Sequence, residues 1–102
     1  MFVFHSDGTV VQSSPDAGDP NSSDSNLMGV WVRDGDAFKG RLVEITADRN
    51  THEFVSRGDI TYRITVSGDA LHGNATAVFH DADWHQIGIP IQATLDGKRV
   101  QP

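Results

Sequence analysis

The sequence contains no cysteine, which excludes a disulfide scaffold, a thiolate metal site, an iron–sulfur cluster and a cysteine nucleophile. It is also poor in positive charge, with 8 Lys and Arg against 14 Asp and Glu and a formal net charge of −6. Affinity for duplex nucleic acid comes from cationic contacts to phosphate, so we expect no nucleic-acid partner. No apolar run approaches the ~20 residues of a membrane span, so we expect no membrane partner.

The length of 102 residues is typical of one domain, which we expect to occupy residues 1–102. Met1 leads directly into Phe2, Val3 and Phe4, without the basic region or cleavage site of a secretory leader. We therefore expect a cytoplasmic protein, or a secreted one if a leader has been removed.

Apolar residues alternate with polar ones along most of the chain, whereas helical periodicity is absent. The clearest case places Ile60, Tyr62 and Ile64 on one face of a strand and Thr61 and Arg63 on the other. Short turns rich in Gly and Asp separate such segments. The pattern predicts an all-β fold with strands near residues 2–5, 9–12, 29–33, 38–47, 54–66, 71–79 and 87–95.

Short turns between successive strands predict an antiparallel meander of about seven or eight strands. Each long strand has one apolar face, and a meander covers such faces by curling into a closed barrel. Glycines within the predicted strands indicate the bends of coiled barrel strands, at Gly40, Gly58, Gly73 and Gly88. Residues 13–26 contain many Ser, Asp and Asn residues and two prolines, which predicts a mobile polar loop.

Three segments resemble small bacterial lipocalin-like barrel proteins of the calycin type: residues 4–9 with Asp7-Gly8, the Gly29-Val30-Trp31 strand, and residues 95–100. The resemblance implies a barrel with an internal cavity for an apolar molecule. Haem-binding nitrobindin-like barrels are less similar, because their Gly-x-Trp continues into a glycine repeat that this chain lacks after Trp31.

The position of the Gly-x-Trp motif departs from the calycin pattern. In calycin barrels it lies near the start of the domain, whereas here a hairpin precedes it, as if a first strand were missing. A missing strand would leave one barrel edge open, and open edges are commonly paired with another chain. We therefore expect a homodimer.

The first functional hypothesis is the binding of a small apolar or aromatic molecule inside the barrel, without a cofactor. The residues expected to contact this molecule are Trp31, Tyr62, Ile64, Phe79, Ile89 and Ile91. Small residues on the same strands would leave space for it, at Gly73, Ala75, Ala77 and Gly88. Alternatively, the taper of the barrel itself requires small residues on one side.

The second hypothesis is a small barrel enzyme that cyclises, isomerises or hydrates an enclosed apolar substrate through one acid–base group. The candidates are Glu44, Tyr62 and Asp81. Alternation does not decide whether Glu44 faces inward with Leu42 or outward into solvent. An inward carboxylate would have a raised pKa.

Residues 80–85, His-Asp-Ala-Asp-Trp-His, form the densest group of potential metal ligands. Their spacing matches no established metal motif, and Asp-Ala-Asp also favours a turn, so we expect no metal. His72 and His80 have the parity of solvent-facing residues.

A third hypothesis has a fully packed barrel without a cavity, in which residues 13–26 bind a partner.

Overall fold

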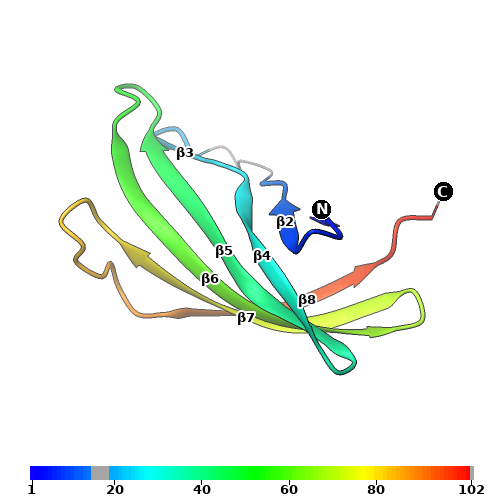
Figure 1. The fold of residues 1–102 in the computed structure, drawn as a ribbon. Helices are drawn as coiled ribbons and strands as arrows, with labels where there is room; N and C mark the ends of the chain where they lie inside the picture. Colours follow the sequence, from blue (N-terminus) through cyan, green and yellow to red (C-terminus); the bar gives the residue numbers. More distant parts are fainter. Residues whose placement is uncertain (15–18, 102) are drawn as a thin grey trace.

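The computed structural model describes residues 1–14 and 19–101, and these residues form one antiparallel sheet of eight strands (Figure 1). This confirms the all-β prediction. None of the described residues belongs to a helix long and apolar enough to cross a membrane. The strands are β1 (Phe2–Phe4), β2 (Thr9–Gln12), β3 (Ser22–Asp24), β4 (Leu27–Asp34), β5 (Ala37–Asp48), β6 (Phe54–Ser67), β7 (Ala70–His80) and β8 (Ile91–Lys98).

The strand order is β1-β2-β4-β5-β6-β7-β8, with β3 paired to the far end of β5. The sheet curls along its long central strands into a half-barrel (Figure 1). The predicted antiparallel barrel-type sheet is confirmed in the form of this half-barrel, but the barrel is not closed, since β1 and β8 are not paired with each other in the described part of the chain. Closure requires both edge strands to pair along their length, and β1, with three residues, offers very little ladder.

The core lies on the concave face and combines large and small residues in each cross-strand row. In one row Gly40 lies between Trp31 and Tyr62, followed by Ala75 on β7. In the adjacent row Leu42, which is 1% exposed, lies beside Ile60. Because a small residue separates the large ones, the large side chains fit on the inside of a strongly curved sheet.

The small positions are filled by their neighbours rather than left as open space. A side chain at Gly58 would meet the ring of Phe79 at 2.6 Å, and one at Gly73 would lie 3.0 Å from Ile64. This agrees with the taper interpretation of the small residues. Gly88, which was expected within a strand, lies in a loop with a φ of +69°.

The last strand differs from the prediction at both ends. It runs from Ile91 to Lys98, and residues 87–90 lie outside any strand, with Ile89 83% exposed. Pro90 has no backbone N–H for a sheet ladder, and Gly88 adopts a left-handed conformation, so the strand begins only after them. Alternation of isoleucines alone therefore placed the start of this strand four residues too early.

The polar segment 13–26 contains a strand that the sequence analysis assigned to a mobile loop. Residues Ser22–Asp24 pair with β5, and the Thr46 hydroxyl donates a hydrogen bond of 2.9 Å to the carboxylate of Asp24. An exposed edge strand needs backbone pairing but no apolar face, so its polar composition concealed it. Residues 15–18 of the segment lie outside the described residues.

Candidate functional site

Five of the eight aromatic residues gather at one end of the concave face: Phe2, Phe4, Trp31, Phe38 and Tyr62. The Trp31 ring contacts Phe38 edge-on at a centroid distance of 5.2 Å and Phe4 edge-on at 6.0 Å. Phe2 and Phe4 are stacked at 5.8 Å. Edge-on and offset contacts of this kind are favourable for aromatic rings, so the cluster forms a firm apolar wall.

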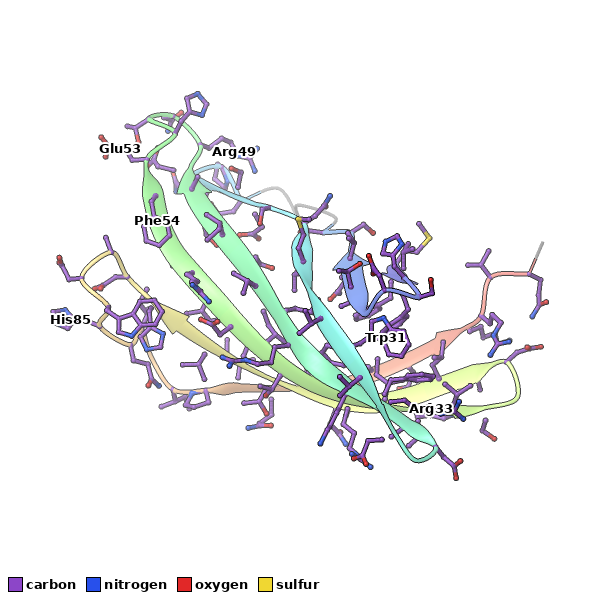
Figure 2. All side chains as sticks on the ribbon, in the orientation of Figure 1. Trp31, Arg33, Arg49, Glu53, Phe54 and His85 are labelled. Carbon is purple, nitrogen blue, oxygen red and sulfur yellow. The ribbon has the colours of Figure 1, made fainter. Side chains whose placement is uncertain are left out.

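Trp31 is held in place by the turn between β1 and β2. Its indole Nε1 donates a 2.8 Å hydrogen bond to the carbonyl of His5, and its backbone amide donates to the carbonyl of Gly8 at 2.9 Å. Gly8 has a φ of +90°, which the Asp7-Gly8 turn requires. Figure 2 shows Trp31 beside the N-terminal hairpin on the concave side.

A pocket of about 670 Å³ lies where the half-barrel fails to close. One wall comes from β1 and the aromatic cluster, and the other from the end of β8 and the residues after it, up to Val100. Val66 and Leu71 form the floor between them. A smaller space of about 210 Å³ adjoins it, since both share Phe2, Phe4 and Leu71, and Ile64 lines the smaller one. The volume of the larger space is typical of pockets for small organic ligands.

The rim of the pocket on the β8 side is charged. Asp96 lies 2.6 Å from His72 Nδ1, so its carboxylate is already engaged. Lys98 and Arg99 also line the pocket, and within the described ranges 1–14 and 19–101 neither has a carboxylate at ion-pair distance. The apolar pocket thus carries two unpaired cations at its mouth.

The structure distributes the predicted ligand contacts along the whole concave face. Trp31 and Ile64 line the two adjoining spaces. Tyr62 is buried in the core at 4% exposure, where its hydroxyl donates to the Val30 carbonyl at 3.1 Å. Phe79 covers Gly58 toward the other end of β6, and Ile91 is 54% exposed at the start of β8. These side chains, together with Ile89, do not surround a common interior.

Glu44 faces the concave side, because it shares the parity of the buried Leu42, and its cross-strand neighbour is Gly58. Burial raises the pKa of the Glu44 carboxyl above its ordinary value, and the negative charge of Asp24 adds to this effect. The structure thus decides the direction that alternation left open. Val43 and Ile45 lie on the convex face.

The three predicted acid–base residues are not brought together. Glu44 is paired with Gly58 and Tyr62 with Gly40, four residues further along the same two strands, which corresponds to about 13 Å. Asp81 lies in the loop after β7, where its Oδ1 accepts hydrogen bonds from the amides of residues 83 and 85. None of the three lines the aromatic pocket.

A second, more polar hollow of about 280 Å³ lies on the convex face. Arg57 binds Asp59 through two nitrogens, at 2.9 and 3.1 Å, and its guanidinium lies 5.7 Å from the ring centroid of Trp84. The imidazole ring of His80 also stacks on the ring of Trp84, at a centroid distance of 4.4 Å. Trp84 therefore covers this part of the outer surface and does not line the aromatic pocket.

The cluster of potential metal ligands in the same loop has a structural role. Donor atoms of Asp81, Asp83 and His85 lie within 4.8 Å of one another. Two loop amides already donate to the Asp81 carboxylate, which explains why the chain is folded tightly here. Figure 2 shows His85 at the opposite end of the molecule from Trp31.

Sequence reasoning missed most of the pocket wall. Phe2, Phe4 and Phe38 were assigned to strands but to no site, and Lys98 and Arg99 were given no role. The common parity of Phe2 and Phe4 was a usable signal. The register that brings them against Trp31 depends on the pairing of β2 with β4, which alternation does not specify.

The chain matches no known family model, and neither the curated proteins nor the solved structures contain a significant match to it.

Proposed function

We propose that the protein binds a small apolar or aromatic molecule in the pocket between β1 and β8. The observation that supports this is the aromatic wall of Phe2, Phe4, Trp31 and Phe38 around a space of about 670 Å³. These four rings are half-buried, and a ligand that covers the part still in contact with water gains affinity by removing it from solvent. The separation of Glu44, Tyr62 and Asp81 favours binding over catalysis.

We further propose that the half-barrel is related to the calycin barrel. The Gly29-Val30-Trp31 motif lies in β4, and the packing of Trp31 against the hairpin turn gives the motif a structural role. In this proposal the ligand site is the open side of the half-barrel rather than an enclosed interior.

Fluorescence titration with the neutral dye phenylnaphthylamine tests the binding proposal. The protein has two tryptophans, and Trp84 lies outside the pocket, so a Trp84→Phe background leaves Trp31 as the only reporter. We expect saturable quenching of Trp31 together with an increase in dye emission. Absence of saturable binding would overturn the proposal.

A pair of matched variants locates the site. Val66 lines the pocket and Val32 lies 55% exposed on β4, outside it. Val66→Phe places a larger side chain in the space that the dye would occupy, so we expect at least about tenfold weaker dye binding, or about 1.4 kcal/mol. The same change at Val32 should leave affinity unaltered. Equal effects at both positions would place the dye elsewhere.

The homodimer is also a proposal, supported by the sheet edges at β1 and β8, which have no further strand beside them among residues 1–14 and 19–101. An unpaired edge strand of eight residues such as β8 presents backbone donors and acceptors to a second copy. Size-exclusion chromatography with light scattering should give twice the mass of one chain. A single-chain mass over a wide concentration range would refute it.

A further inference from the structure

We propose that the preferred ligand carries an anionic group at one end of its apolar body, and that Lys98 and Arg99 bind this group. This inference rests on the proposed pocket and adds a charge requirement to it. The two residues line the pocket on the β8 side, opposite the aromatic wall. An aromatic wall on one side and cations on the other match a molecule with one apolar and one negatively charged end.

The backbone fixes where these two cations lie. Lys98 forms the last pair of the β7–β8 ladder with Ala70, and the Arg99 amide donates to the carbonyl of Asp69 at 2.8 Å. Their side chains are exposed, so the long aliphatic stems can lie along the apolar mouth while the charged ends stay in water. By register Arg99 shares the parity of Gly97 on the concave face, whereas Lys98 has the opposite parity and reaches the rim from its outer edge through its long flexible stem.

Charge pairing distinguishes these cations from most others on the sheet; Arg33, which donates to the Gly35 carbonyl at 3.2 Å, also has no carboxylate partner among the described residues, but it does not line the pocket. Lys39 and Arg63 pair with Asp34, and Arg57 pairs with Asp59. Lys98 and Arg99 have no such partner within residues 1–14 and 19–101, although the chain has a large excess of carboxylates. Asp96, the acidic residue of the pocket, is engaged by His72.

The net charge of −6 makes an anion preference informative. Long-range repulsion disfavours anions over most of this protein's surface, so tighter binding of an anion requires a local source of positive charge. In the described structure the cationic side chains that line the pocket are those of Lys98 and Arg99; the amino group of Met1, another lining residue, donates to the Ser13 hydroxyl at 3.0 Å.

Two dyes with the same aromatic body test the inference: neutral phenylnaphthylamine and its sulfonated analogue, anilinonaphthalene sulfonate. We expect the sulfonate to bind about three- to tenfold more tightly at low salt, the range that two exposed charge contacts provide. Lys98→Gln with Arg99→Gln should abolish this preference and leave binding of the neutral dye unchanged. Raising the salt concentration should have a similar effect.

The control is Lys39→Gln with Arg41→Gln, which removes the same charge from the convex face. It should preserve the preference for the sulfonate. If the neutral dye binds but the sulfonate is no tighter, or if both double variants lower the preference equally, the charge inference fails and the pocket proposal stands. If neither dye binds saturably, both fail.

Discussion

Tyr62 is the only tyrosine of the chain, so its ionisation reports directly on the interior of the half-barrel. Its ring is 4% exposed, and burial raises the pKa of the Tyr62 phenol from 10.0 to about 12. That difference corresponds to about 3 kcal/mol of additional free energy to form the phenolate in the folded protein. Alkaline titration followed by tyrosinate absorbance should therefore give a pKa near 12 for the folded chain and near 10 in denaturant.

The same shift links Tyr62 to stability. Between the unfolded pKa of 10 and the folded pKa of about 12, the folded state holds more protons than the unfolded state, so the free energy of unfolding falls as pH rises. Tyr62→Phe should remove this slope. It also loses the hydrogen bond to the Val30 carbonyl, at a cost of about 0.5–1.5 kcal/mol at neutral pH. Ionisation of Tyr62 near pH 10 in a chain that remains folded would refute the proposed packing of the core.

Three further substitutions test other parts of the fold by denaturant unfolding. Leu42→Ala removes a core side chain that is 1% exposed and should cost about 2–5 kcal/mol, whereas Val32→Ala on the convex face should cost under about 0.5 kcal/mol. Glu44→Gln should stabilise the protein at neutral pH, because the raised pKa of Glu44 means that its ionised form is disfavoured on folding. This gain should disappear below the ordinary carboxyl pKa, and a constant difference across pH would contradict it. Gly40→Ala places a Cβ 1.9 Å from the Val30 carbonyl oxygen and should cost about 1–3 kcal/mol or more, whereas Gly97→Ala meets only an ordinary contact and should be neutral.

The alternation of apolar and polar residues correctly predicted those strands in which burial of one row of side chains determines the conformation. Ile60, Tyr62 and Ile64 alternate cleanly with polar residues, and all three are buried on one face of β6. The strand predictions failed where backbone hydrogen bonding or backbone geometry, rather than side-chain alternation, determines the conformation. Ser22–Asp24 forms a strand through ladder bonds with no apolar face, and Pro90 ends the isoleucine alternation before β8 begins.

The pocket was harder to predict than the sheet because it depends on which strands remain unpaired. Inward parity predicts an enclosed interior, with ligand contacts from residues such as Phe79 and Ile91. The pocket instead lies between β1 and the end of β8, which are separated by almost the whole chain. Whether two edges meet depends on curvature and strand length, and neither is encoded in the parity of a single strand.

The N-terminal hairpin is joined to the sheet through few residues, and this affects both its amide hydrogen exchange and the release of a bound ligand. β1 pairs only with β2, over three residues, and β2 joins the remaining sheet through four residues of β4. Peripheral elements of this kind open at a lower free energy than central strands, so their amides should exchange with solvent hydrogen before those of β6. Phe2 and Phe4 are carried on this hairpin, so the motion that exposes its amides also removes one side of the aromatic pocket. For any molecule held there, release and the earliest step of unfolding follow the same path, and tight occupancy should slow both.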